Sequence, residues 1–221
     1  MAEIRLEDVK NRDDIQTYIA RGDRNMESIG YTEHGFRHAD LVAERAQYIM
    51  KELGRDSREV ELAAIAGYLH DIGNVANRQA HWEVAVMIAY SVLKEMGMPP
   101  AELAEIMAGV GNHEEPYGDP FGPVAAAVII ADKSDVARTR VRDMHPSRYD
   151  EHDRVNYATI SSSVTVNHER TMISLSLEID TTIAPIMEYF ELFLQRMVMA
   201  RRAALMLGCT FELVINGTKL L

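Results

Sequence analysis

The stretch AIAGYLHDIGN, residues 64–74, decides how this chain of 221 residues is interpreted. It places a histidine and an aspartate, His70 and Asp71, at the end of an apolar segment with helical spacing, for which Ser57 is the predicted N-cap. Neighbouring side chains on a regular helix point about 100° apart, but at a helix end they can converge. We therefore predict that this pair closes a helix and faces a common centre.

Four more helices are predicted in the first two thirds of the chain, and each carries a histidine or aspartate on its apolar face. The first of these spans Gly35 to Leu53 and carries His38, and the second spans His81 to Met96 and begins with His81 itself. The third starts at Pro99 and Pro100 and ends at His113, and the fourth lies around Val124 and carries Asp132. Together with the helix that ends at His70 and Asp71, they predict a helical domain over residues 1–154.

The periodicity changes near residue 155. Residues 157–166 and 173–179 alternate between apolar and polar side chains, which predicts a hairpin that turns near Asn167. A long helix over 184–207 and a strand over 209–215 follow, with a turn at Asn216 and Gly217. We predict a small α+β module of the order ββαβ over residues 155–221, with antiparallel strands and one long helix. The fold class is mainly α.

Composition excludes several classes of protein. The formal net charge of −11 argues against binding to nucleic acid polymers or anionic membranes, because proteins bind these through surfaces rich in lysine and arginine. The single cysteine, Cys209, cannot form an internal disulfide, and there is neither a secretory signal nor an apolar run that could span a bilayer. We expect a cytoplasmic protein whose substrate is a small molecule, and an anionic one if a metal supplies positive charge.

Six ligand-type side chains stand out on these helices: His38, His70, Asp71, His81, His113 and Asp132. Any one of the histidines alone is more typical of a hydrogen-bonded core residue. As a set they are costly to bury unless something satisfies all of them, and a metal cluster does so at once. The set therefore predicts a metal site.

The sequence resembles the HD superfamily of metal-dependent phosphohydrolases over roughly residues 30 to 140. HGFRHADLVAERA (34–46), AIAGYLHDIGN (64–74) and VAAAVIIADKSD (124–135) match its H…HD…D signature in order and helical context. His81 in AHWEVAV and His113 in VGNHEEPYG match two further histidines of members that hold two metals, such as the HD-type diadenosine tetraphosphate hydrolases. The resemblance implies an HD-domain helical bundle.

By that resemblance, His38, His70, Asp71 and Asp132 would hold one ion, and Asp71 would bridge to a second ion held by His81 and His113. His70 and Asp71 would form the catalytic pair. Two divalent ions of this kind activate a water molecule, which would cleave a phosphate mono- or diester, with nucleotides among the candidate substrates. Imidazole and carboxylate ligands favour Fe or Mn, while Mg, Zn and Ni stay open.

Substrate-binding residues are less marked in the sequence. Many HD sequences have a lysine where this chain has Asn74, so the positive charge for the phosphate is expected elsewhere. The predicted candidates are Arg78, Lys133, Arg138 and His34, the last of which lies four residues before His38 on the predicted helix. For Lys133 an ion pair with a nearby acid is the alternative, and for Arg138 a solvated helix end.

Two other functions fit the same six ligands. An HD-type di-iron oxygenase would use the same ligand order, and a metal-bound sensor or regulatory module would use the metal structurally. The methionines of the long C-terminal helix fit core packing, or alternatively a face that joins two copies into a homodimer.

Overall fold

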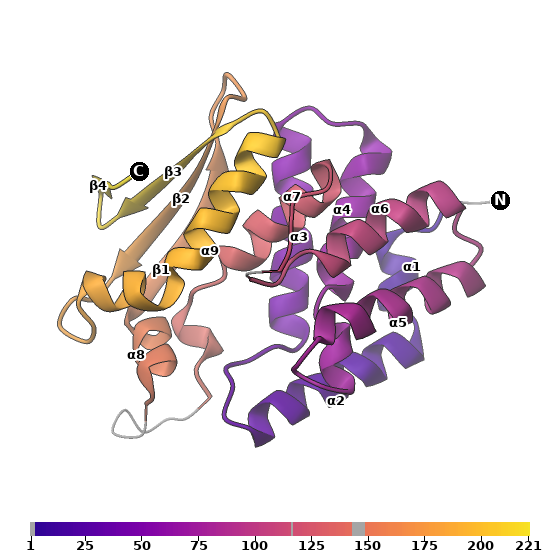
Figure 1. The fold of residues 1–221 in the computed structure, drawn as a ribbon, viewed down its shortest axis with the longest axis horizontal. Coiled ribbons are helices and arrows are strands. Elements are labelled where there is room, and N and C mark those ends of the chain that lie inside the picture. Colours follow the sequence, from indigo (N-terminus) through magenta and orange to yellow (C-terminus); the bar gives the residue numbers. More distant parts are fainter. Residues whose placement is uncertain (1–2, 116, 143–148) are drawn as a thin grey trace.

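The computed structural model describes residues 3–115, 117–142 and 149–221. Its elements are, in chain order, α1 (Leu6–Lys10), α2 (Asp13–Ser28), α3 (Phe36–Glu52), α4 (Ser57–Leu69), η1 (Ile72–Val75), α5 (His81–Glu95), α6 (Pro100–Gly111), α7 (Pro123–Lys133), η2 (Arg138–Arg140), α8 (Glu151–Ala158), β1 (Thr159–Val166), β2 (Met172–Ile179), α9 (Ile186–Met206), β3 (Thr210–Ile215) and β4 (Thr218–Lys219). Figure 1 shows a helical part followed by a small sheet, which confirms the predicted fold class.

Helix α7 lies at the centre of the molecule (Figure 1). Every residue from Val124 to Lys133 is buried, and the helix packs against α3, α4, α6 and α9. Its sequence is rich in alanine and valine, so neighbouring helices can approach it closely on all sides. A hydrophobic cluster therefore runs from the N-terminal helices into the C-terminal sheet. The predicted domain boundary at residues 154 and 155 stays a prediction.

The sheet has the strand order β1-β2-β3-β4, and one pairing differs from the prediction of antiparallel strands throughout. Strands β1 and β2 form the predicted antiparallel hairpin, but β3 runs parallel to β2. The physical reason is helix α9, which carries the chain back along the sheet before β3 begins. A parallel pair needs such a crossover, and a helix is the usual one.

The start of the first strand also differs. The predicted strand begins at Tyr157, whereas helix α8, capped by the Asp150 side chain, continues to Ala158. The pairing register then shifts between Thr159 and Ser161. Because a one-residue irregularity moves side chains to the other face of a strand, Ile160 is 53% exposed instead of facing the core as its spacing predicts.

Helix α2, which the sequence pattern did not predict, supports the segment after the His70-Asp71 pair. Gly22 brings α2 close to η1, since a Cβ atom there would lie 3.2 Å from the Val75 nitrogen. Asn25 donates hydrogen bonds to the carbonyl oxygens of Asn74 (3.1 Å) and Val75 (2.9 Å). Asn74 itself is buried. Helix α2 therefore fixes the turn that aims Asp71.

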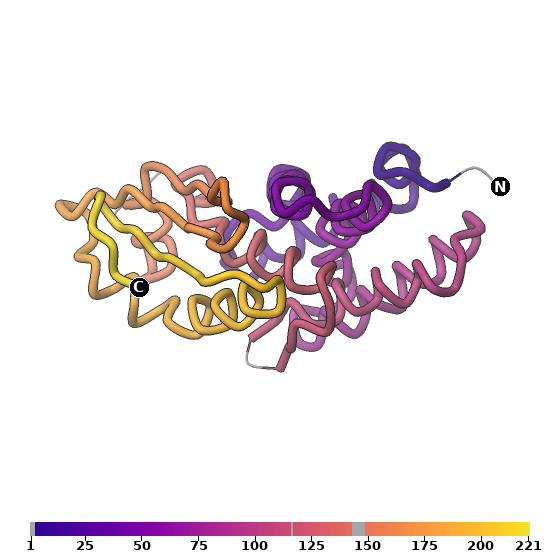
Figure 2. Tube along the Cα trace, turned by 90° about the horizontal axis from the view of Figure 1, so that it is seen from above, coloured from indigo at the N-terminus to yellow at the C-terminus, as the bar shows by residue number. Residues whose placement is uncertain are grey.

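Figure 2 shows an elongated molecule with the described N- and C-terminal ends at opposite ends of its long direction. Among the methionines of α9, Met197 and Met199 are core residues, whereas Met187 and Met206 are exposed. The homodimer stays a prediction. Within the described ranges, none of the helices is both long enough and apolar enough to cross a membrane.

Candidate metal centre

The six side chains predicted as metal ligands meet at helix ends. His38 lies in the first turns of α3, His70 and Asp71 join α4 to η1, His81 opens α5, His113 follows α6, and Asp132 is near the end of α7. All of them are buried except Asp71, whose side chain is 10% exposed. The structure therefore brings together every residue of the predicted ligand set.

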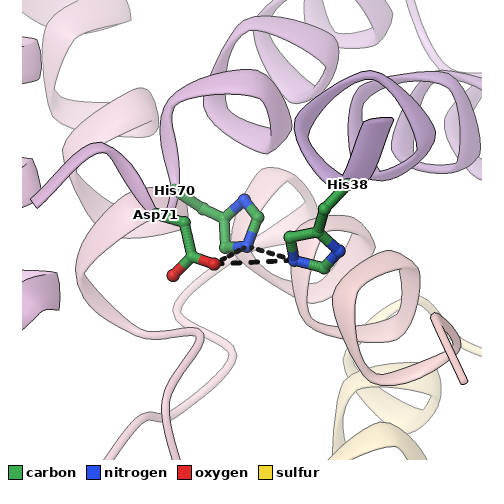
Figure 3. A group of neighbouring side chains, drawn as sticks. All are labelled: His38, His70 and Asp71. Carbon is green, nitrogen blue, oxygen red and sulfur yellow. Dashed lines mark hydrogen bonds and ion pairs between the residues drawn. The ribbon is translucent and has the colours of Figure 1, made fainter. Parts of the chain in front are cut away.

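The first group of ligands is formed by His38, His70, Asp71 and Asp132, of which Figure 3 shows the first three. The Nε2 atoms of His38 and His70 are 3.1 Å apart, and Asp71 Oδ2 lies 3.6 and 3.4 Å from them. Asp132 Oδ1 lies 3.4 Å from His38 Nε2 and 3.8 Å from His70 Nε2. The Nε2 atoms of His38 and His70 thus lie close to one carboxylate oxygen of Asp71 and one of Asp132.

The second group is formed by Asp71, His81 and His113. The Nε2 atoms of the two histidines are 3.0 Å apart. Asp71 turns its other oxygen to them, since Oδ1 lies 3.1 Å from His81 Nε2 and 3.6 Å from His113 Nε2. One carboxylate thus serves both groups, with Oδ2 toward the first and Oδ1 toward the second. This is the arrangement of a bridging ligand.

The other ring nitrogen of each histidine is held by an oxygen atom. In three histidines Nδ1 lies next to a backbone carbonyl oxygen: His70 at 2.7 Å from Gly67, His113 at 2.7 Å from Val110 and His81 at 3.0 Å from Arg78. In His38 it lies 2.6 Å from the Asp135 carboxylate. An acceptor at Nδ1 keeps the proton there and leaves a lone pair on Nε2. Lone pairs that face each other at about 3 Å need a cation between them. The donor set therefore fits metal ions.

Electrostatics within the cluster favour ionised carboxylates. Burial raises the pKa of Asp71, but its close contacts with His70, His113 and His81 hold that pKa well below its usual range. Burial lowers the pKa of His113 and so favours its neutral form, which is the form that binds metals. Burial also lowers the pKa of His70, yet Asp71 and Asp132 raise it by more. The carboxylates thus favour a positive charge at the centre.

Asp135 supports the site and was not predicted from the sequence. It is fully buried, and besides His38 it accepts a hydrogen bond of 2.7 Å from Arg37 Nη2, while Arg140 Nε lies 3.6 Å from its carboxylate. The sequence feature that could have indicated Asp135 is its position as a second acidic residue, three residues after Asp132. Such a carboxylate fixes both the tautomer and the orientation of the ligating imidazole.

Asp135→Asn is expected to lower the free energy of unfolding of the metal-free protein by about 3–5 kcal/mol at neutral pH, because it leaves buried cations without their counter-charge. Burial raises the pKa of Asp135, but Arg140, His38 and Arg37 hold it well below the ordinary value of 3.8. The stabilisation is thus present above that value and lost as pH falls below it.

Urea denaturation of wild type and Asp135→Asn, at neutral pH and at about pH 3, measures this difference. We expect the difference between the two unfolding free energies to be smaller at about pH 3, where Asp135 is largely protonated in the unfolded chain. A difference that stays the same at both pH values would contradict the role of the Asp135 charge.

Two of the four predicted substrate-binding residues, Arg78 and His34, line a cavity of about 320 Å³ beside the cluster. Arg78 Nη1 lies 3.1 Å from His81 Nε2. The ring of His34 is 5.6 Å from that of His38, but His34 precedes α3, which begins at Phe36. His34 therefore lies just before the helix that carries His38, because the chain enters that helix only after Gly35.

The other two predicted residues have different surroundings. Lys133 is buried, and its Nζ lies 2.8 Å from Asp132 Oδ2 and 2.9 Å from Glu115 Oε2. The alternative of an ion pair is therefore what the structure shows. Arg138 is exposed, and its guanidinium lies 4.4 Å from the centre of the Tyr157 ring. The structure does not bring Arg138 to the cluster.

The sequence pattern missed Glu115 and Arg196, and it favoured Arg138 over Arg140. In η2 the buried arginine is Arg140 and not Arg138. The 3.6-residue spacing of an α-helix does not tell which arginine faces inward here, because η2 is a short 3-10 helix. Arg196 lies on α9, and its Nε is 3.4 Å from Glu115 Oε1. No local pattern connects residues so distant in the chain, so only the tertiary structure places them together.

Two comparisons with known proteins found a match, and a third found none. Residues 35–137 match the family model of the HD domain, and this segment contains all six ligands, which confirms the resemblance. A crystal structure of a predicted HD superfamily hydrolase from an uncultured Thermotogales bacterium is 22% identical, covers 56% of this chain and 67% of its own chain, and superposes with a TM-score of 0.45. No curated protein matches the sequence.

Proposed function

Because the chain carries an HD domain over residues 35–137, we propose that it is a metal-dependent phosphohydrolase that cleaves a phosphate mono- or diester. The observation that carries this proposal is the convergence of four Nε2 atoms and two carboxylates on a centre shared through Asp71. Nucleotides are among the candidate substrates. We further propose Fe or Mn as the metals, since imidazole and carboxylate ligands suit both.

Asp71 and the four histidines are the residues that would hold two divalent ions, with Asp132 completing the first group. When bound, such ions supply positive charge for the phosphoryl oxygens and lower the pKa of a water molecule from 15.7 toward about 7. They would also explain how a chain with a net charge of −11 accepts an anionic substrate. No lysine or arginine surface is needed for that.

Other residues of the chain orient the ligands and the substrate. Lys133 contacts Oδ2 of Asp132, which leaves Oδ1 turned toward His38 and His70. Arg78 lies between the second group and the cavity, where its guanidinium can donate to a phosphoryl oxygen. We therefore propose Arg78 as a substrate-binding residue and Lys133 as a positioning residue for Asp132.

Reconstitution tests the proposed function. Protein stripped of metal by a chelator and then loaded with Mn²⁺ or Fe²⁺ is expected to release product from a panel of para-nitrophenyl phosphate, bis-para-nitrophenyl phosphate and nucleotides, whereas stripped protein is expected to be inactive. His113→Ala is expected to lower the rate by about 10²-fold or more, because several kcal/mol of charge stabilisation are lost with the second ion.

His168→Ala is the matched control, since His168 is an exposed histidine in the turn between β1 and β2 and its loss should leave the rate unchanged. Oxygen consumption is recorded in the same samples. Metal-loaded protein that hydrolyses nothing in the panel would refute the phosphohydrolase, and oxygen uptake without hydrolysis would favour the oxygenase.

A further inference from the structure

We propose that the cavity beside the metal centre binds a second anionic group of the substrate, and that Arg196 of helix α9 is its principal ligand. This inference rests on the proposed function because it takes the phosphoryl group that is cleaved to lie at the six metal ligands. The substrate class is then an organic phosphate that carries a further phosphate or carboxylate group.

The cavity lies where the helical part of the fold meets α8 and α9. Its volume of about 320 Å³ falls within the range of small-molecule sites. Arginines from three separate segments line it: Arg78, Arg140 and Arg196. Such a concentration of guanidinium groups is unusual in a chain with a net charge of −11, and it favours an anionic ligand.

Two of these guanidinium groups are held against aromatic rings. The Cζ atom of Arg196 lies 4.7 Å from the centre of the Phe193 ring, one turn earlier on α9, and that of Arg78 lies 5.5 Å from the Tyr31 ring. Stacking of this kind restricts the guanidinium plane and leaves its N–H groups at the edge free to donate. The two arginines are thus oriented before a ligand arrives.

Arg196 differs from the other two arginines in its hydrogen bonding. Across the described ranges, its terminal nitrogens carry no hydrogen bond, and its one ion pair is the 3.4 Å contact from Nε to Glu115. The N–H groups of Arg140 are committed to the Glu33 carbonyl oxygen and to Asp135, and Arg78 contacts Glu114. The terminal N–H groups of Arg196 can therefore donate hydrogen bonds to a planar anion. The Arg196 side chain is only 23% exposed.

A short chain of contacts connects Arg196 to the metal centre. Asp132 Oδ2 lies 2.8 Å from Lys133 Nζ, Lys133 Nζ lies 2.9 Å from Glu115 Oε2, and Glu115 Oε1 faces Arg196. Glu115 Oε1 is buried and has no hydrogen-bond partner within the part of the chain that the structure describes. Arg196 is thus linked to Asp132 through Lys133 and Glu115, and the cavity that it lines is also lined by His34 and Arg78, which contact His38 and His81.

The cavity also has acidic residues, Asp150 and Asp153 of the α8 region. The Asp150 side chain accepts a hydrogen bond of 2.8 Å from the Asp153 amide and so caps α8, where the helix N-terminus offsets its charge. The cavity thus offers cations beside the metal centre and hydrogen-bond acceptors beside α8. This pattern suits a substrate body that carries hydroxyl or amino groups.

Isothermal titration calorimetry on metal-loaded, full-length protein tests the proposal without turnover. The probes are trimethylene bisphosphonate, phosphonobutyrate and propylphosphonate, which carry a second phosphonate, a carboxylate or no second anion. Wild type is expected to bind at least one of the two probes with a second anionic group about 10-fold or more tightly than propylphosphonate, a step typical of a charge-assisted contact. The preferred probe shows whether the second group is a phosphate or a carboxylate.

Arg196→Gln is expected to lose this preference while its affinity for propylphosphonate stays unchanged, and Arg196→Lys is expected to keep part of it. Arg201→Gln is the matched control, because Arg201 is an exposed arginine on the same helix and lines a different pocket. It should behave as wild type.

A preference that survives in Arg196→Gln, or that is lost equally in Arg201→Gln, would overturn the inference. The same holds if wild type shows no preference for either probe with a second anionic group. Selective loss in Arg196→Gln combined with no hydrolysis of any phosphate ester would uphold the anion site and refute the proposed function. Hydrolysis of a phosphate ester, combined with an unchanged probe preference in Arg196→Gln, would uphold the proposed function and refute the anion site.

Discussion

Asp71→Ala is expected to abolish phosphate-ester hydrolysis and to remove both metal ions, a larger effect than the loss of any other single ligand. Among the residues that the structure describes, Asp71 alone belongs to both ligand groups, with Oδ2 at 3.4 Å from His70 and Oδ1 at 3.1 Å from His81. The metal ions supply several kcal/mol of charge stabilisation in the transition state. Since each 1.36 kcal/mol is a factor of ten, the rate should fall by about 10³-fold or more.

The measurement is the rate of product release by metal-loaded protein, with metal content determined on the same sample. Asp40→Ala serves as the control, because Asp40 lies on α3 near the site but pairs with Lys10 at the surface. It should keep both metals and the full rate. An Asp71→Ala protein that retains its metals and turns over within tenfold of wild type would show that Asp71 is not the bridge.

Gly73→Ala is expected to have the largest effect on stability. A Cβ atom at Gly73 would lie 1.9 Å from the carbonyl oxygen of His81 and 2.7 Å from the backbone nitrogen of Ala85. Both are backbone atoms of α5, so the helix itself has to move. We expect a loss of about 4 kcal/mol or more in the free energy of unfolding, which corresponds to a fall in Tm of roughly 8–16 °C for a chain of this size.

Thermal unfolding of metal-free protein measures this effect separately from metal loss. Gly111→Ala is the control, since its Cβ would meet only the end of the Val86 side chain, at 2.9 Å. That side chain can rotate away at small cost. If Gly73→Ala unfolds at the wild-type temperature, then the close packing of η1 on α5 does not hold His81 in place.

The inward position of the candidate metal ligands could be predicted from the sequence because it depends on local information. A histidine or aspartate at helical spacing with apolar neighbours has to point inward, as His38, His113 and Asp132 do. The order of these residues along the chain, together with the adjacent pair His70 and Asp71, then indicates a family whose helical domain brings them together. Periodicity and order were sufficient for this part of the site.

The residues around the ligands could not be predicted in this way. Asp135 contacts His38 across 97 positions of the chain, and Glu115 lies between Lys133 and Arg196, the latter from helix α9. Spacing tells which face of a helix is apolar, but it does not tell which polar group of another element will lie opposite. For the same reason the parallel pairing of β2 with β3 depends on where α9 packs and not on the strand pattern.

Counting metal ions per chain tests the central claim most directly. Full-length protein, stripped and reloaded with Mn²⁺ or Fe²⁺, is analysed by plasma mass spectrometry alongside His81→Ala. If Asp71 bridges two groups of ligands, wild type will hold two ions per chain, and His81→Ala will keep the first while losing the second. A wild-type protein that holds one ion or none at saturating metal, or a His81→Ala protein that still holds two, would contradict the dinuclear centre.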